Sequence, residues 1–122
     1  MRIDLEQKNE ICILRFHGRL VAGVDPEVMQ AKADEIKKLK CPKVLADIRD
    51  MSAIGSTGLG FLVAMYSSAL KVPGGHFVLV GPQPRVKEVL DLTRLSTIIP
   101  TFADLDSGLK ALLGAAAAND AG

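Results

Sequence analysis

Apolar runs of strand length alternate with segments of helical periodicity along most of the chain, and Pro or Gly residues separate them. We expect strands at residues 2–7, 11–17, 43–48 and 76–80, with a short edge strand at 98–99. We expect helices at residues 26–40, from the turn at 55–58 to residue 70, from residues 82–84 onward, and at 104–113. This order predicts an α/β fold: a mixed, mostly parallel sheet of four to five strands with an N-terminal hairpin, packed by about four helices.

The first expected helix has clear boundary residues. Asp25 is suited to the N-cap and Pro26 to the first helical position, and Cys41-Pro42 ends the segment. Its apolar residues recur at helical spacing: Met29, Ala33, Ile36 and Leu39. These features predict an amphipathic helix with one face on the core.

Apolar residues divide the second expected helix into two faces. The face assigned to the core consists of Leu59, Leu62, Val63, Tyr66 and Leu70. Phe61 and Met65 fall on another face, where they could contact a partner. In the third helix, Val86, Val89 and Leu90 form the inward stripe.

The composition excludes several classes of function. The chain has 122 residues with 15 basic and 14 acidic side chains, so its net charge of +1 gives no electrostatic basis for binding nucleic acid. No apolar run approaches the roughly 20 residues that cross a bilayer, so we expect no membrane insertion. The N-terminus lacks the apolar segment of a signal peptide, which favours a cytoplasmic location. We expect one domain at residues 1–113, followed by a flexible, alanine-rich tail at 114–122.

Cys12 and Cys41 are far apart in sequence and have no metal-ligand spacing. Two buried thiols are favoured over a disulfide. His17 and His76 each stand alone in an expected strand, so we expect no metal site, and we see no motif for a cofactor.

The segment VLADIRDMSAIGSTGLGFLV, residues 44–63, places two hydroxyls between two glycines where a strand gives way to a helix. A phosphate-binding loop would need a Gly-Lys-Ser/Thr ending, which is absent. A nucleophile elbow would need Gly two positions before Ser56, where Ile54 stands, and the only later histidine, His76, has no evident triad partner. We therefore expect a binding protein and not an enzyme.

The simplest role for Ser56 or Thr57 is an N-cap of the following helix. One hydroxyl suffices for a cap, yet Gly55, Gly58 and Gly60 also remove side chains around the turn, at a cost in helix propensity for the last two. Such open backbone would let the active site of another protein reach the hydroxyl.

The same segment resembles the motif of STAS domains, the fold of bacterial anti-sigma factor antagonists, in which a strand ending in Asp leads to Asp-Ser-Ser-Gly-Leu at a helix start. Gly18 and Leu20 fit the family's Gly-Glu-Leu-Asp element, and residues 81–112 resemble its C-terminal segment. The resemblance implies partner switching: the antagonist binds an anti-sigma factor, often a serine kinase, phosphorylation breaks the complex, and a serine phosphatase restores it. Carried across, the phosphorylated residue is Ser56, with Thr57 as the second choice. The partner-binding residues are then Gly55, Ser56, Thr57, Gly58, Phe61, Met65 and Asp25.

Two positions differ from the family pattern. Gly55 stands where the family has an acid before the serine, and Val21 stands at the acid of the Gly-Glu-Leu-Asp element, whose Glu aligns with Arg19. Asp47 keeps the acid at the strand end. These differences leave open a second hypothesis, a docking subunit without phosphorylation, similar to STAS proteins on the ATPase of lipid-transport ABC complexes. A small-molecule or nucleotide sensor is a third, and the chain could be a monomer or a weak homodimer.

Overall fold

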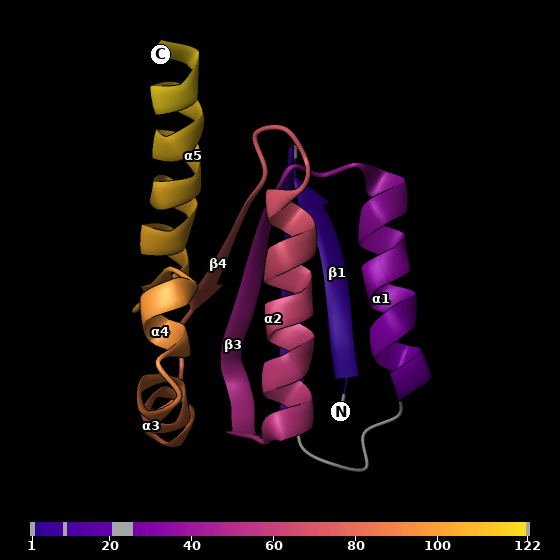
Figure 1. The fold of residues 1–122 in the computed structure, drawn as a ribbon, viewed down its shortest axis with the longest axis vertical. Helices are drawn as coiled ribbons and strands as arrows, with labels where there is room; N and C mark the ends of the chain where they lie inside the picture. Colours follow the sequence, from indigo (N-terminus) through magenta and orange to yellow (C-terminus); the bar gives the residue numbers. More distant parts are fainter. Residues whose placement is uncertain (1, 9, 21–25, 122) are drawn as a thin grey trace.

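The computed structural model describes residues 2–8, 10–20 and 26–121 (Figure 1). Within these residues the elements are β1 (Arg2–Lys8), β2 (Ile11–Leu20), α1 (Pro26–Leu39), β3 (Lys43–Ile54), α2 (Ser56–Leu70), β4 (His76–Val80), α3 (Pro84–Leu92), α4 (Leu95–Ile98), β5 (Thr101–Phe102) and α5 (Leu105–Ala121). The strands form one sheet in the order β1-β2-β3-β4-β5. β1 and β2 pair antiparallel and all other pairs are parallel, which confirms the predicted hairpin and mostly parallel sheet.

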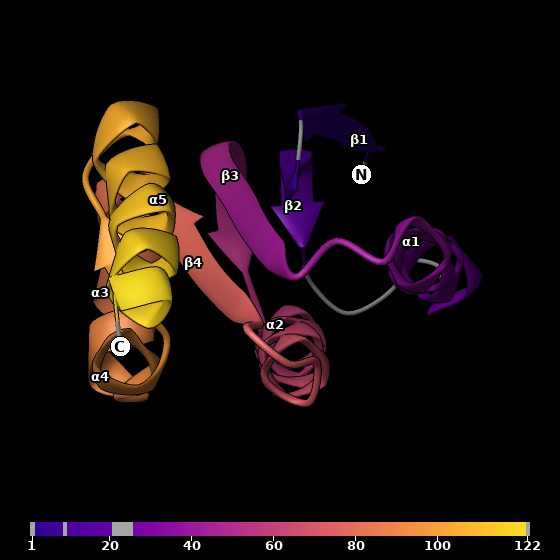
Figure 2. The same cartoon turned by 90° about the horizontal axis from the view of Figure 1, so that it is seen from above.

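Helices cover both faces of the sheet. Figure 2 shows α2 and α5 on opposite sides of β4, and α1 beside the hairpin. The larger hydrophobic cluster joins the sheet to α1, α2 and α3 through residues that include Met29, Leu62 and Leu90. The smaller cluster joins the other face to α5 through Leu45, Val78 and Leu112. The two clusters make a three-layer domain, with the start of α2 at one end of the sheet.

β3 is longer than the sequence predicts. We expected it to end at residue 48, but it continues to Ile54, since β2 also continues to Leu20 and pairs with it. The partner strand satisfies backbone groups along residues 49–53, so the polar side chains of Arg49, Asp50 and Ser52 do not end the strand. Asp47 therefore lies within β3 and not at its end.

The edge strand lies three residues beyond its predicted position. Ile98 belongs to the short helix α4, which starts after Arg94 adopts a left-handed conformation (φ 63°). The ladder to β4 includes the bond from the Leu79 N–H to the Pro100 carbonyl, and β5 follows at Thr101–Phe102. Ile98 and Ile99, predicted to form the strand, instead lie at the end of α4, where Ile99 is fully buried.

Cys12 and Cys41 form a disulfide, so the prediction of two free thiols is wrong. Cys12 lies near the start of β2 and Cys41 just before β3, and the parallel pairing of these strands brings their α-carbons to 6.0 Å. That separation suits a disulfide, and only the strand register could reveal it. At the other end of the chain, α5 continues to Ala121, so the backbone beyond residue 113 is helical, and the flexibility expected for the tail stays a prediction.

Candidate functional site

The Gly-Ser-Thr-Gly turn lies at the end of β3, where α2 begins. Gly55 is the N-cap, with φ −118° and ψ −171°, and its N–H donates to the Leu20 carbonyl at 2.9 Å. Its own carbonyl accepts the first helical bond, from the Leu59 N–H at 2.9 Å. Ser56 and Thr57 are the first two residues of the helix, and no side chain caps it. The prediction that either hydroxyl is the N-cap is therefore wrong.

Both hydroxyls at the turn are available. Ser56 and Thr57 are exposed, and neither side chain has a hydrogen-bond partner among the residues that the structure describes. The first turn of α2 has no acidic residue. The N–H groups of residues 56–58 precede the first helical bond, so they have no carbonyl partner within the helix. An exposed hydroxyl thus stands at the positive end of a helix.

Gly58 is buried and serves packing. A β-carbon on this residue would lie 2.5 Å from the Leu20 carbonyl oxygen, 2.7 Å from Leu20 Cγ and 2.9 Å from Ile54 Cγ1. The sequence interpretation of Gly58 as a clearing for a partner is therefore wrong, because the space is filled by β2 and β3. Gly60, in contrast, is exposed and a β-carbon there would meet nothing within 4 Å.

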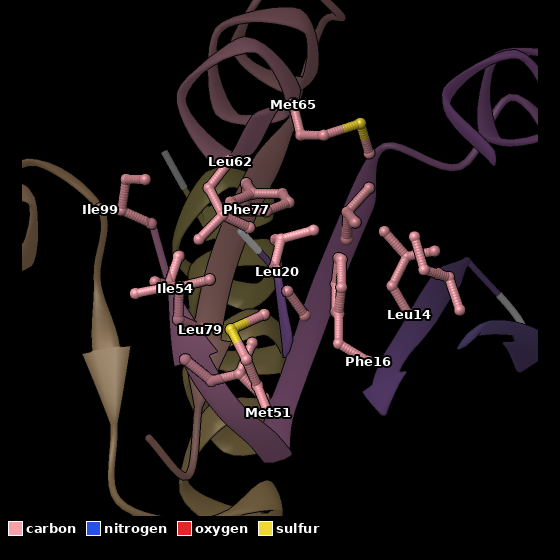
Figure 3. Packing of buried hydrophobic residues seen from close by; sticks show 14 of the residues in the cluster. Leu14, Phe16, Leu20, Met51, Ile54, Leu62, Met65, Phe77, Leu79 and Ile99 are labelled. Carbon is pink, nitrogen blue, oxygen red and sulfur yellow. The ribbon is translucent and has the colours of Figure 1, made fainter. Parts of the chain in front are cut away.

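The close approach at Gly58 also sets which face of α2 is inside. The buried residues are Gly58, Leu62, Met65 and Ala69, whereas Val63 and Leu70 are 39% and 50% exposed. Figure 3 shows Met65 and Leu62 directed into the cluster around Phe77 and Leu20. Met65 is thus a core residue, not the exposed contact that the sequence suggested, and Val63 and Leu70 were wrongly assigned to the core.

Phe61 is half-buried and packs edge-on against Phe16, with ring centroids 6.2 Å apart. The exposed face of α2 beyond the turn consists instead mainly of small and polar residues, with Val63 and Leu70 as its larger apolar members: Gly60, Val63, Ala64, Ser67, Ser68 and Leu70. Sequence reasoning missed this face because it assigned the large apolar residues to the two sides of the helix without the constraint that Gly58 imposes.

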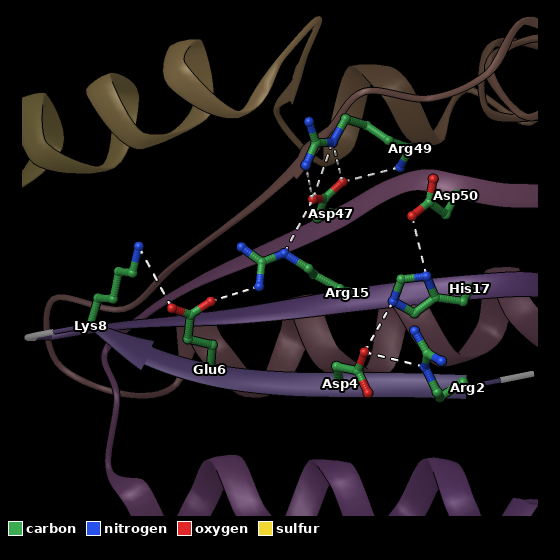
Figure 4. Close-up of polar contacts among 9 residues, drawn as sticks. All are labelled: Arg2, Asp4, Glu6, Lys8, Arg15, His17, Asp47, Arg49 and Asp50. Atoms are coloured by element: carbon green, nitrogen blue, oxygen red, sulfur yellow. Dashed lines mark hydrogen bonds and ion pairs between the residues drawn. The ribbon is translucent and has the colours of Figure 1, made fainter.

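Asp47 lies on the opposite face of the sheet from α2. Its side chain is only 4% exposed and accepts from the Arg49 guanidinium, with an Nη2–Oδ2 distance of 2.8 Å (Figure 4). Arg15 Nε lies 3.7 Å from the same carboxylate. The hydrogen bond to Asp47 raises the pKa of Arg49 above its ordinary value. Asp47 therefore anchors two arginines and does not orient the Ser56 hydroxyl.

The described residues contain no group of three metal-ligating side chains. Asp25 and Val21, which the sequence analysis associated with the turn, lie outside the described residues. The structure thus brings together Gly55, Ser56, Thr57 and the exposed side of α2, and separates them from Asp47.

A family model described as the STAS domain matches residues 2–108. The chain belongs to the STAS domain family. The match spans all five strands of this STAS domain and its helices up to the start of α5, which confirms the fold class predicted from the sequence.

Among its relatives, the anti-sigma F factor antagonist of Paenibacillus polymyxa is 22% identical over 102 residues, covering 84% of this STAS domain and 86% of the relative. A crystal structure assigned to an anti-sigma factor antagonist of Thermotoga maritima superimposes with a TM-score of 0.82 at 24% identity, covering 90% and 93% of the two chains. The Bacillus cell fate determinant SpoIIAA in its phosphorylated form superimposes with a TM-score of 0.65 at 18% identity, covering 91% and 99%. Separately, none of the helices in the described part of this STAS domain has the length and apolar character needed to cross a bilayer.

Proposed function

We propose that this STAS domain is an anti-sigma factor antagonist that binds an anti-sigma factor of the serine kinase type and is released when Ser56 is phosphorylated. The observation that carries the proposal is the exposed Ser56 hydroxyl at the first position of α2, unused by the N-cap. The proposed contact surface consists of Gly55, Ser56, Thr57 and the exposed side of α2. Asp25, which precedes α1 in the sequence, stays in the proposed set on the strength of the family resemblance alone. The domain acts as a binder and a kinase substrate, without catalysis of its own.

A phosphate on Ser56 suits this position. It would carry nearly two negative charges at the end of the helix where N–H groups lack helical partners, so the fold would tolerate it. No acidic side chain in the first turn of α2 would repel it. The same charge would stand within the contact surface, where a partner that bound the neutral hydroxyl would have to desolvate it. Phosphorylation would therefore weaken the complex and leave the domain folded.

The relatives support this function. The Paenibacillus polymyxa protein is named an antagonist of the anti-sigma F factor, and SpoIIAA has a phosphorylated form. By the same analogy, the partners of this domain are an anti-sigma factor with serine kinase activity and a serine phosphatase that restores the free hydroxyl. We propose that the domain acts in the cytoplasm, as a monomer or a weak homodimer.

The test is a quantitative pull-down from the source organism with tagged wild type, Ser56→Asp and Ser56→Ala, and with Thr57→Ala as the matched control. We expect wild type to retain a serine kinase of the anti-sigma type and Ser56→Asp to bind it at least about tenfold more weakly, equivalent to about 1.4 kcal/mol. Incubation of the retained kinase with ATP should phosphorylate wild type and Thr57→Ala but not Ser56→Ala. Equal retention by wild type and Ser56→Asp would contradict the proposed switch.

A docking subunit without a phosphoswitch is the alternative, and Gly55 favours it. The residue before Ser56 has no side chain, so it offers no carboxylate to orient the hydroxyl or to pair with a basic partner. In that case wild type and Ser56→Asp would both retain the ATPase of a lipid-transport complex. Mass spectrometry would then find no phosphoserine at position 56.

A further inference from the structure

A pocket of about 410 Å³ lies between the C-terminal halves of α1 and α2. Residues from the end of α1, from α2 and from the start of β3 line it, and Figures 1 and 2 show α1 standing apart from α2 along this length. Its volume falls within the range of about 300–1,000 Å³ that is typical of small-molecule sites. None of residues 55–57 lines the pocket, so it is separate from the Ser56 turn.

Most of the pocket wall is apolar. Ile36, Met65 and Ala69 are core residues at its base, and the wall continues through Phe61 of α2 and Val72, which follows that helix. The lining includes no acidic side chain, whereas Lys37 and Lys40 both belong to it. An apolar cavity with two cations and no anion at its edge complements a molecule that has an apolar chain and one anionic group.

The two lysines have no anionic partner of their own in the described part of the chain. The nearest acids along α1 are already engaged: Asp34 accepts from the Gln30 amide, and Glu35 pairs with Lys32. Lys37 lies in the last turn of α1 and Lys40 directly follows the helix, and both line the same pocket. Two exposed ammonium groups thus remain available at one side of the pocket.

The backbone at Lys40 adds a second observation. Lys40 follows α1 in a left-handed conformation, with φ 54°, and its N–H donates to the Ile36 carbonyl. Glycine is the usual residue at this position of a helix end because a side chain there costs free energy. The backbone conformation at position 40 favours glycine, yet the residue is a lysine whose charge lies at the pocket. Backbone strain of this kind is often found at ligand sites.

We propose that this pocket binds a free medium-chain carboxylate, a fatty acid, with its alkyl chain between α1 and α2 and its carboxylate between Lys37 and Lys40. Burial of the chain supplies most of the affinity, and each added methylene should tighten binding by about fourfold until the pocket is full. The lysines select the anion over a neutral headgroup. This site does not depend on the function proposed for Ser56.

The test is calorimetric titration of the purified wild-type domain with octanoate, decanoate and dodecanoate, and with dodecanol as the neutral control. We expect saturable binding with one site per chain, affinity that rises with chain length, and weaker binding of dodecanol. Ala64→Trp would fill the pocket mouth and should weaken dodecanoate binding at least about tenfold, whereas Ser67→Trp, on the same helix but outside the lining, should not. Circular dichroism of both variants would verify the fold.

Removal of the charges is the second arm. Lys37→Gln with Lys40→Gln should weaken dodecanoate binding by about twofold to thirtyfold, the range for two exposed ion pairs, and should leave dodecanol binding unchanged. Lys38→Gln, at the same helix end but outside the lining, is the matched control.

Absence of saturable dodecanoate binding by wild type, or equal effects of the Ala64 and Ser67 variants, would overturn the site. Equal binding of dodecanol and dodecanoate would overturn the carboxylate assignment. If no carboxylate binds and Ala64→Trp weakens only the anti-sigma factor complex, the pocket belongs to the protein interface and the proposal fails.

Discussion

The sharpest prediction concerns the two glycines of α2, which sit two residues apart in opposite environments. Gly58→Ala would put a methyl group 2.5 Å from the Leu20 carbonyl oxygen, and Gly60→Ala would put one into open space. Both substitutions replace glycine by alanine within one helix. Any difference between them therefore reports the packing of α2 on β2.

The expected magnitudes follow from two opposing terms. Alanine in place of glycine inside a helix stabilises by up to about 1 kcal/mol. Overpacking costs about 1–3 kcal/mol, and Gly58 belongs in the upper half of that range because the contacted oxygen is backbone and cannot move by a rotamer change. Gly58→Ala should thus destabilise by about 1–2 kcal/mol net, while Gly60→Ala should stabilise by about 0.5–1 kcal/mol.

Urea unfolding followed by circular dichroism would measure both changes. With a slope of about 2 kcal/mol per molar urea, the midpoint should fall by about 0.5–1 M for Gly58→Ala and rise by about 0.3–0.5 M for Gly60→Ala. The slopes should be unchanged. A Gly58→Ala variant as stable as wild type would refute the reasoning, because it would mean that Leu20 and α2 do not approach as closely as the structure has them.

Three other predictions concern the rest of the fold. Reduction of the Cys12–Cys41 disulfide, with a sequence separation of 29, should lower the free energy of unfolding by about 3–4 kcal/mol on the loop-entropy model, and the double Cys→Ala variant should be insensitive to reductant in the same melts. Arg49→Ala should cost about 1–3 kcal/mol, because it removes the nearer guanidinium from a buried carboxylate and leaves Arg15 at 3.7 Å as its cation. Asp47→Ala should cost less, because it leaves arginines that reach water, and equal costs in urea unfolding would contradict this. The backbone N–H of Ser107 lowers the pKa of Asp104 below its ordinary value of 3.8, so its contribution should be full above that value and lost as pH falls through the folded pKa. The stability difference between wild type and Asp104→Asn should therefore shrink on acidification, and a difference that is constant with pH would count against it.

The sheet could be predicted from the sequence because β2, β3 and β4 each contain an apolar run and turn residues separate the strands from the helices. Residues 76–80 were assigned with the same boundaries as β4, and the strands expected at 2–7 and 11–17 form the predicted antiparallel hairpin. Ser56 could also be located, since the glycines around it mark the point where strand period gives way to helix period. These features depend on local sequence alone.

The errors lie where a contact between distant segments decides the outcome. The N-cap is Gly55 and not a hydroxyl because the Gly55 N–H bonds to Leu20, in another strand. The pairing of β2 with the end of β3 also lengthens both strands beyond their apolar runs. The disulfide likewise follows from the register of β2 on β3, which no spacing of two cysteines can show.

Gly58 connects these corrections to function. Its contact with Leu20 turns Leu62 and Met65 inward, and this rotation leaves Ala64 and Val63 on the outer side of α2. The proposed partner surface is therefore small and flat near Ser56, where one phosphate can change its character, and not a ridge of large apolar side chains. The same rotation puts Met65 at the base of the pocket, toward the other end of the helix.

A phosphate at Ser56 and a fatty acid between α1 and α2 would thus act on one helix from different ends. Because none of residues 55–57 lines the pocket, Ser56→Asp should leave dodecanoate affinity unchanged in the titration. A large change would mean that α2 moves as a unit when its N-terminus gains charge, which would couple the two sites.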